Sequence, residues 1–471
     1  MFRRSNVCAA AIVLLALALP PDEAAAQDSH YWSEQYGTRS ALLGGALIGS
    51  VRDLSSTFYN PGAAALNLES RFLLSARAYR RSETTLEDGG GEGVDLTTSN
   101  QRPLPTILAT PIEFDWLGKH RIIYSVLTRQ QYDADLSTYD IGDRDVLPAP
   151  GDEVAASAYT GTAELRETWT GITWAYPLTE RVGIGVTPYL AVRSQTIKSQ
   201  TLLQAASSEG DVAIATRLRN RDFRHYRGLA KIGLAGEFGR WSVGVTATTP
   251  SFSISGSGRA AFNGSSAGVE GEDDVLVADV QSDLSSTYES GWAVGAGFGL
   301  QFGGTRLHGS AEWFQAIDPF TVLDAEDFVP QTGGDVLVND MTAELESVLN
   351  WGLGLEQSLG RTMLFAGVAL DRSAANPDAP AQTTTTLTNY DLWRYSAGAS
   401  FRLGRSEFML GLAYAQGSQP FPQVLQDRIE TGLGPLEEDI QLRFTQWTVV
   451  LGYEFATGGG GDDEEAESRE R

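Results

Sequence analysis

The side chains best placed for chemistry in this sequence are cations that interrupt segments of alternating apolar residues. Arg227 and Lys231 lie in one such segment, Tyr189 and Arg193 in the segment before it, and Arg394 in a later one. Successive side chains of an extended chain point to opposite faces, so these residues lie opposite the apolar face of their segments. Two guanidinium groups on neighbouring strands can hold one carboxylate, which predicts an anion site at Arg193 and Arg227.

Catalytic, metal and cofactor chemistry finds no comparable support. The four histidines, His30, His120, His225 and His308, are far apart and match no metal-ligand spacing. A hydrolase needs a serine–histidine pair, and no serine motif accompanies a histidine here. The acidic stretch at 270–274 is more typical of a solvated loop than of a calcium site. We therefore expect no enzyme, no metal centre and no cofactor.

Composition narrows the class of protein further. The chain has 471 residues and a formal net charge of −25, so it lacks the basic face that nucleic-acid binding requires. Hydrophobic residues make up 42% of the chain and charged residues 20%, which is typical of a folded protein. The single cysteine excludes a disulfide framework and a cysteine-based zinc site.

The N-terminus is typical of an export signal. Arg3 and Arg4 precede an apolar stretch over 7–19, and three alanines at 24–26 form a small-residue cleavage site. The apolar stretch is shorter than the roughly 20 residues that a membrane-spanning helix needs. Residues 1–26 are therefore predicted to be a signal peptide that is removed on export.

Beyond the signal, most of the chain alternates between apolar and small or polar residues. In 292–302 one face carries Trp292, Phe298 and Phe302, and the other carries mainly glycine. A period of two with one apolar face indicates strands, and a small or polar second face indicates that the apolar face meets lipid. A soluble all-β protein is the alternative, but it needs a covering layer that the sequence lacks.

The connections between the expected strands are alternately short and long. Six short turns and seven loops rich in Gly, Asp, Glu, Ser and Pro predict fourteen strands. The expected turns are 115–119, 178–181, 238–240, 302–305, 359–361 and 403–405. Aromatic residues gather beside these turns, as at a membrane interface. The sequence thus predicts an all-β fold, a 14-stranded antiparallel transmembrane β-barrel over residues 70–457.

Two segments fall outside the expected barrel. Residues 27–69 precede the first strand and lack sustained alternation. Residues 458–471 continue from glycines into a run of acids, which predicts a disordered acidic tail.

The segment 27–69 carries two motifs that resemble a known family. The first reads GTRSALLGGA over 37–46, and the second reads DLSSTFYNPGAAAL over 53–66. They resemble the pattern G-x-R-x-x-x-x-G-G-A … D-x-S-x-x-x-x-N-P-A-x-L of the FadL/TodX-type outer-membrane transporters of hydrophobic compounds. The resemblance implies fourteen strands and an N-terminal hatch that plugs the lumen. The motif residues expected to matter in the hatch are Gly44, Gly45, Asn60, Pro61 and Gly62.

Three details modify what the resemblance implies. Gly62 stands where alanine usually follows Asn-Pro, and Asn-Pro-Gly still favours a tight turn or, alternatively, a moving gate. The loops at 205–212 and 263–274 are short and acidic, whereas the family has long loops that form an apolar capture groove. Polar residues over 193–204 and Pro250 in a later strand indicate a kink or a side opening in the wall.

The expected binding residues have two interpretations inside a barrel. They hold the carboxylate of a ligand, or they pair with inward acids to pin the hatch and fill the lumen. The acids that could serve the second role are Glu312, Glu356, Asp371, Glu407 and Glu454.

The resemblance implies passive transport of small hydrophobic molecules, either long-chain fatty acids or aromatic hydrocarbons, across the outer membrane. We expect a monomer that contacts outer-membrane lipid and lipopolysaccharide and binds a hydrophobic small molecule or a fatty acid. A scaffold or secretion-associated barrel that binds a protein partner is one alternative, which the acidic tail favours. A general hydrophilic porin is the second alternative, against which the hatch argues.

Overall fold

A computed structural model describes most of the chain. The described residues are 29–66, 73–87, 95–101, 104–142, 147, 153–269, 274–332, 336–376, 389–403, 406–420 and 441–455. The expected signal peptide and acidic tail lie outside them.

Short helices occur in the N-terminal segment and in one turn, and the remaining regular structure is strand. The helices are α2 (Thr38–Leu42), α3 (Ser56–Tyr59), η1 (Pro61–Ala65) and η2 (Asp115–Leu117). The strands are β1 (Leu73–Leu86), β2 (Leu96–Gln101), β3 (Leu104–Ile112), β4 (Arg121–Gly142), β5 (Glu153–Pro177), β6 (Val182–Ser207), β7 (Val212–Phe238), β8 (Trp241–Thr248), β9 (Phe252–Ala267), β10 (Val275–Ser285), β11 (Ala293–Phe302), β12 (Thr305–Phe314), β13 (Ile317–Leu323), β14 (Met341–Leu345), β15 (Val348–Leu359), β16 (Thr362–Asp371), β17 (Leu392–Leu403), β18 (Ser406–Pro420) and β19 (Gln441–Phe455).

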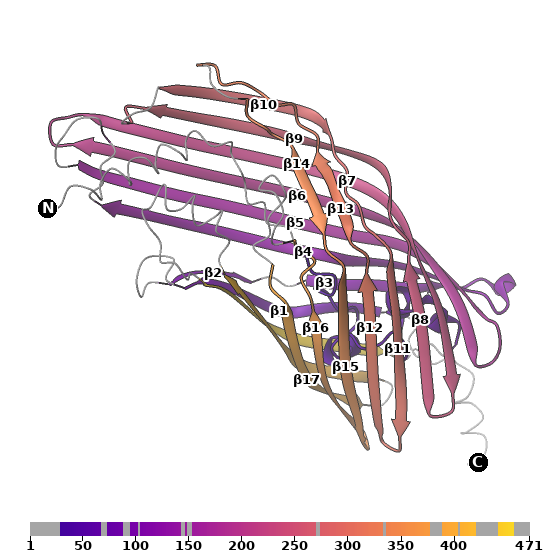
Figure 1. Ribbon diagram of the computed structural model, residues 1–471. Helices are drawn as coiled ribbons and strands as arrows, with labels where there is room; N and C mark the ends of the chain where they lie inside the picture. The colour runs from indigo at the N-terminus through magenta and orange to yellow at the C-terminus, as the bar shows by residue number, and fades with distance from the viewer. Residues whose placement is uncertain are drawn as a thin grey trace, which may run out of the picture.

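The strands form a succession of antiparallel neighbours (Figure 1). From β1 it passes through β3, β4, β5, β6, β7, β8, β11, β12, β15, β16, β17, β18 and β19. Strand β19 then pairs with β1, with Trp447 opposite Arg81. Strand β2 also pairs with β1, while β9 and β10 continue the wall above β8 and β11. Neighbours on both sides satisfy the backbone hydrogen bonds that a strand needs in lipid.

Strands β4 to β7 are much longer than the others, and together with β9 and β10 they form a curved sheet that extends beyond the rest of the wall (Figure 1). Strand β7 has 27 residues, whereas β15 has 12. Strand β6 pairs with β7 without a break from Val182 to Ala206, so the polar stretch over 193–204 does not interrupt the ladder. Its outward side chains change from apolar to polar along the strand, and that change suggested a kink.

Among the described residues, the wall is interrupted where Pro250 was expected to disturb a strand. Residues 249–251 separate β8 from β9, and residues 286–292 separate β10 from β11. Ser251 N donates to Ser290 O and Ser290 N donates to Ser251 Oγ, both at 3.0 Å, so the two interruptions touch. Proline has no N–H for the ladder, which explains the break at Pro250.

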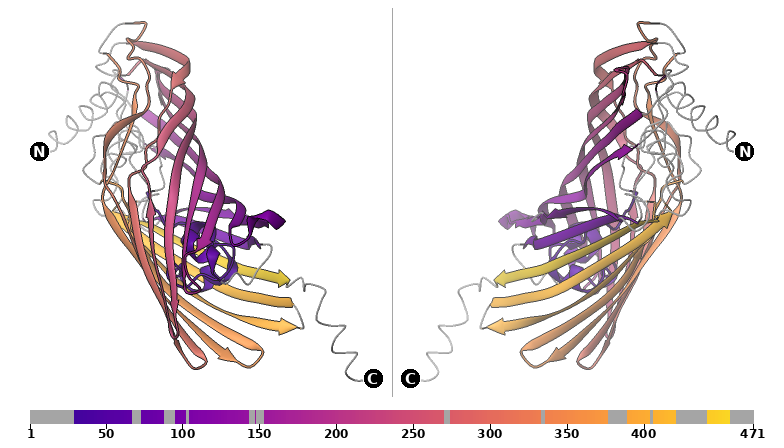
Figure 2. Two further views of the ribbon diagram at one scale, coloured as in Figure 1. Left: turned by 90° about the vertical axis from the view of Figure 1, so that its right-hand side faces the viewer. Right: turned by 90° about the vertical axis from the view of Figure 1, so that its left-hand side faces the viewer.

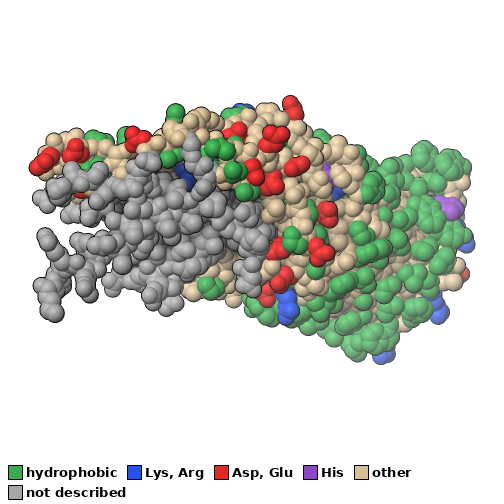
Figure 3. Space-filling model, turned by 45° about the horizontal axis from the view of Figure 1, so that its top comes forward, with side chains coloured by type: hydrophobic (Ala, Val, Ile, Leu, Met, Phe, Trp, Pro, Cys, Tyr) green, Lys and Arg blue, Asp and Glu red, His purple; other side chains and the backbone are tan. Residues whose placement is uncertain are grey.

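The outer surface of the wall divides into an apolar zone and a polar zone. The apolar side chains gather at the end with the short turns, while acids and other polar groups lie further along the strands (Figure 3). Trp116, beside one short turn, is 79% exposed. Other exposed large apolar residues include Ile172, Leu190, Ile232, Leu234, Val243, Val245, Val294, Phe298, Leu353 and Leu410. None of the helices formed by the described residues is long and apolar enough to span a membrane.

Residues 29–66 lie inside the wall, where α2, α3 and η1 fold into a small plug (Figure 2). None of these residues is exposed. Leu42, Leu47 and Leu54 are fully buried and share one core with wall residues such as Ile107 and Ile123. We call residues 29–66 the hatch.

Glycines on both sides bring hatch and wall into backbone contact. A Cβ atom on Gly49 would lie 2.2 Å from the carbonyl carbon of Gly297 in β11. A Cβ on Gly62 would lie 2.6 Å from Gly233 O and 2.7 Å from Gly183 O. The inward glycines of the wall therefore accommodate the hatch, a role that the sequence left open between hatch and ligand.

The Asn-Pro-Gly motif starts a helix instead of forming an isolated turn. Asn60 precedes η1, and its Oδ1 accepts from Gly62 N at 3.0 Å. Its Nδ2 donates to Ile48 O at 2.9 Å and to Leu234 O in β7 at 3.1 Å. Pro61 fits the first helical position because its missing N–H has no partner there. Asn60 thus fixes the end of the hatch to the wall.

Candidate functional site

The centre of the candidate site is the carboxylate of Glu167 on the inner face of β5. Arg193 Nη1 donates to Glu167 Oε2 at 2.9 Å, and Arg227 Nη2 donates to Oε1 at 2.6 Å. All three side chains are almost completely buried. Arg193 and Arg227 therefore converge on one carboxylate, and that carboxylate belongs to the protein.

Neighbouring side chains hold this group in place. Trp169 Nε1 donates to Glu167 Oε1 at 2.6 Å, and Gln130 Oε1 accepts from Arg193 Nη1 at 2.9 Å. The ring of Tyr288 lies 3.7 Å from the Arg193 guanidinium carbon and 4.9 Å from that of Arg227. A cation facing an aromatic ring gains stability, most of all away from water. The two arginines are thus clamped between a carboxylate and an aromatic ring.

A second ion pair lies close by and includes the hatch. Lys231 Nζ donates to Glu312 Oε1 at 3.0 Å, and the hatch residue Trp32 donates to Glu312 Oε2 at 2.9 Å. Lys231 Nζ also lies 4.5 Å from the centre of the Phe58 ring, which belongs to α3. Lys231 therefore joins the wall to two parts of the hatch.

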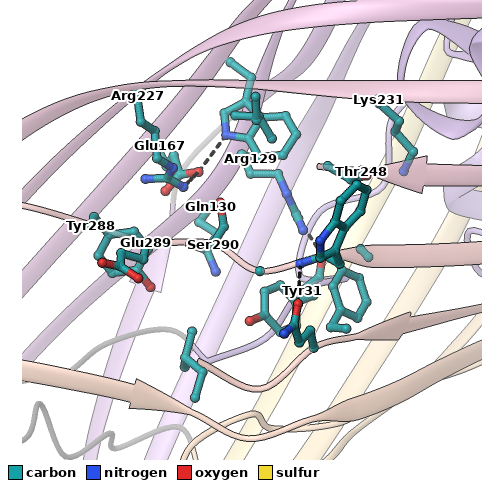
Figure 4. Close-up of a pocket in the computed structure, with 18 of the residues that line it drawn as sticks. Tyr31, Arg129, Gln130, Glu167, Arg227, Lys231, Thr248, Tyr288, Glu289 and Ser290 are labelled. Atoms are coloured by element: carbon teal, nitrogen blue, oxygen red, sulfur yellow. Dashed lines mark hydrogen bonds and ion pairs between the residues drawn. The ribbon is translucent and has the colours of Figure 1, made fainter. Parts of the chain in front are cut away.

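Arg129 of β4 is a further buried cation beside the hatch. Its Nη1 donates to Tyr31 O at 2.5 Å, and its guanidinium lies 5.4 Å from the Trp169 ring. Burial raises the pKa of the Tyr31 hydroxyl well above its usual range, so this hydroxyl remains protonated. Figure 4 shows Arg129 between the Glu167–Arg227 pair and Tyr31.

These side chains surround a cavity of about 50 Å³ between the hatch and the wall. Its apolar lining includes Tyr31, Phe58, Trp169, Leu229, Tyr288, Trp292 and Phe314. It also borders the interrupted wall, because Thr248 and residues 288–292 line it. A cavity that holds benzene is roughly 150 Å³, so in this state the cavity accommodates a few water molecules only.

One cation of the cavity lining retains unused hydrogen-bond donors. The lining includes three cations, Arg129, Arg227 and Lys231, and three carboxylates, those of Glu167, Glu289 and Glu312. Arg227 lines the cavity, and its buried Nε and Nη1 atoms have no hydrogen-bond partner among the described residues. The cavity can therefore receive a hydrophobic molecule together with an acceptor oxygen or an anionic group.

Three of the expected binding residues, Tyr189, Arg193 and Arg394, do not line this cavity, and Arg193 reaches it only through Glu167. Tyr189 donates its hydroxyl to Thr57 O at 2.7 Å and supports the hatch. Arg394 donates to Trp32 O and lies 3.4 Å from Asp371 Oδ2. Gly44, with a φ of 63°, packs against Val368 in β16, and Gly45 has a φ of 74°. These positions fix the hatch in the lumen.

Sequence reasoning missed Glu167, Arg129 and Tyr288. Glu167 stands directly opposite Arg193 in the ladder of β5 and β6, a register that the short turn at 178–181 sets. That turn is a signal in the sequence from which Glu167 could have been found. Arg129 lies at a bulge between Thr128 and Gln130, and Tyr288 lies in a connection between strands, so alternation points to neither.

The described residues contain no group of three or more His, Asp or Glu side chains arranged to hold a metal ion.

Solved structures similar to this chain share its architecture over almost the whole length. A Pseudomonas aeruginosa FadL homologue has a TM-score of 0.58 at 13% identity, covering 90% of this chain and 99% of its own. The Pseudomonas putida toluene transporter TodX has a TM-score of 0.55 at 11% identity, covering 92% and 99%. The Ralstonia pickettii toluene transporter TbuX has a TM-score of 0.53 at 11% identity, covering 90% and 98%. The chain has the fold of these transporters.

The shared fold confirms the resemblance to FadL/TodX-type transporters that the sequence motifs indicated. No family model matches the sequence, and no curated protein matches it. Identities of 11–13% establish the fold alone, so the chemistry of this chain has to be argued from its own residues.

Proposed function

We propose that this chain is a fourteen-stranded outer-membrane barrel that transports small hydrophobic molecules passively. In this proposal residues 1–26 are the export signal, 27–69 the hatch and 70–457 the wall of a monomeric channel embedded in outer-membrane lipid and lipopolysaccharide. The cycle of pairings from β1 to β19 and back, which includes fourteen strands, supports the barrel. The exposed apolar zone beside the short turns supports its place in a membrane.

The observation that carries the proposed transport is the buried cavity between hatch and wall. It combines aromatic and aliphatic side chains with the two unpartnered nitrogens of Arg227, a combination suited to a molecule that is hydrophobic and carries a carboxylate. The similar structures include two toluene transporters and a monoaromatic hydrocarbon channel, CymD, which supports aromatic hydrocarbons as an alternative cargo. We propose long-chain fatty acids or aromatic hydrocarbons as the substrate class.

Transport requires a more open state than the one described. The cavity of about 50 Å³ is smaller than an aromatic ring needs, and the hatch closes the lumen. Entry therefore requires the hatch side chains around Phe58 and Tyr31 to move. Flux then follows the concentration gradient of the cargo.

Uptake by whole cells tests the proposal. Cells that lack their own hydrophobe channels are given labelled oleate, toluene and a small sugar, with and without this chain. A gain for oleate or toluene alone supports transport and identifies the substrate chemistry. No gain for any of the three, with the barrel folded in the membrane, overturns transport in favour of the scaffold. Large steady conductance in planar bilayers overturns it in favour of a porin.

A further inference from the structure

A second cavity lies at the short-turn end of the lumen, on the other side of the hatch. It measures about 340 Å³ and is lined by Arg39, Arg52 and Asp53 of the hatch and by the turn residues Gly303 and Gly304. Strands β11, β12 and β15 to β18 complete the lining. It shares no lining residue with the cavity at Arg227.

Four arginines line this second cavity in a chain whose net charge is −25. Three of them have a carboxylate partner. The pairs are Arg39 with Glu356, Arg52 with Glu237 and Arg402 with Glu407. A remaining acid of the lining, Asp53, accepts from Ser55 N at 2.8 Å.

Arg306 of β12 is the fourth arginine, and unlike the other three it has no carboxylate partner among the described residues. It is 6% exposed, and no carboxylate of the described residues lies within 4.0 Å of its guanidinium. Glu356 is its cross-strand neighbour in β15, but that carboxylate binds Arg39 through two hydrogen bonds. Arg306 Nη2 donates to Ser242 Oγ at 2.9 Å, and its buried Nε has no partner. Burial of a cation without a counter-charge is costly, so an anion at this point is favoured.

We propose that the second cavity binds an oxyanion, a carboxylate or a phosphate group, with Arg306 as its central cation. Planar guanidinium groups bind both kinds of oxyanion through paired N–H donors. Arg306 comes from the wall, whereas Arg39 and Arg52 come from the hatch, so a bound anion links the two parts. The binding site itself does not depend on transport. Short turns of outer-membrane barrels face the periplasm, so the second cavity would open to the periplasm. This orientation, unlike the anion site itself, rests on the proposed membrane location.

Calorimetric titration of the full mature chain in nanodiscs tests this proposal. Inorganic phosphate and acetate are titrated separately at constant ionic strength. We expect saturable binding of one anion per chain, and the anion that binds identifies which of the two oxyanions the site prefers. Binding of neither anion overturns the proposal, whatever the variants show.

Matched variants locate the bound anion. R306Q is expected to weaken binding at least tenfold, whereas R240Q, in the exposed turn between β7 and β8 at the same end, binds like the parent chain. R402Q is the substitute variant if R306Q does not fold. The Arg402 side chain is 68% exposed at the rim of the cavity, so its replacement should not affect folding. We expect R402Q to weaken binding two- to threefold. Equal affinity of R306Q and the parent, or of R402Q and the parent if R306Q does not fold, would overturn the assignment.

A further variant separates this site from the proposed transport. R227M alters the other cavity and is expected to leave anion binding here unchanged. Failure of the uptake experiment with intact anion binding would overturn transport and retain this site. Loss of anion binding in R227M would show that the two cavities are one site and overturn the proposal of a separate one.

Discussion

Glu167 and Arg193 lie directly opposite each other in the ladder of β5 and β6, and their side chains pair at 2.9 Å. The same carboxylate also binds Arg227, so one acid balances two buried cations. A buried ion pair stabilises little by itself, but removal of one partner leaves an uncompensated charge. The carboxylate of Glu167 is therefore a structural requirement for both arginines.

The first prediction concerns removal of this carboxylate. E167Q leaves Arg193 and Arg227 buried without an acid and is expected to destabilise the folded chain by about 3–5 kcal/mol. Urea unfolding in detergent micelles measures the change. E164Q, on an exposed position of the same strand, serves as the control and should lie within about 0.5 kcal/mol of the parent. Equal stability of E167Q and the parent would contradict this account.

The second prediction separates the two arginines. Arg227 has two buried nitrogens without partners at the cavity, so R227M should reduce oleate uptake about tenfold, because hydrogen bonds to charged groups contribute roughly 1.5–3 kcal/mol. Toluene uptake should change less than about twofold, since toluene has no acceptor. R193M should reduce uptake of both through lower stability, because Arg193 is fully enclosed. A parallel loss of oleate and toluene uptake in R227M would show that Arg227 is structural.

The third prediction tests movement of the hatch. Ser50 Oγ and His308 Nδ1 are 2.7 Å apart, which joins the hatch to β12. S50C/H308C should form a disulfide, and the only natural cysteine, Cys8, lies in the expected signal peptide. Oxidation is expected to abolish uptake and a reductant to restore it, with each single-cysteine variant as control. Mass spectrometry verifies the disulfide. If the crosslinked channel still shows undiminished uptake, the contact between Ser50 and His308 does not need to open.

The fourth prediction concerns the backbone contact between hatch and wall. G49A places a methyl group 2.2 Å from the carbonyl carbon of Gly297, where only backbone is available to yield. The hatch should shift, at a cost of about 1–3 kcal/mol, and planar bilayers should record a higher conductance than the parent gives. G304A meets a flexible side-chain atom of Gln357 at 3.3 Å and should conduct like the parent. If G49A conducts no more than the parent and is equally stable, the close backbone contact between Gly49 and Gly297 is wrong.

The strands and turns of the wall were predictable because their signals are local. In 292–302 the large side chains alternate with glycine, and the exposed fractions of Val294, Phe298 and Phe302 place them on the outside. The turns at 178–181 and 302–305 occur where expected. Strand β6 ends at Ser207, close to the start of the loop expected over 205–212.

The site was only partly predictable from the sequence. The alternation of apolar and polar residues was enough to predict that Arg193 and Arg227 lie together on the inner face. It also placed Lys231 on that face. The acid that binds both arginines follows from strand register, which requires the turn as well as the strands. Arg129 depends on a bulge, and Phe58 depends on how the hatch folds, so no periodic pattern contains either of them.

The glycine contacts also limit how this channel can be re-engineered. Gly49 meets Gly297, and Gly62 meets Gly183 and Gly233, with backbone on both sides. A hatch transplanted from another barrel brings side chains to positions where this wall has no room for them. The exchangeable module is therefore the hatch together with its glycine-bearing strands, β6, β7 and β11.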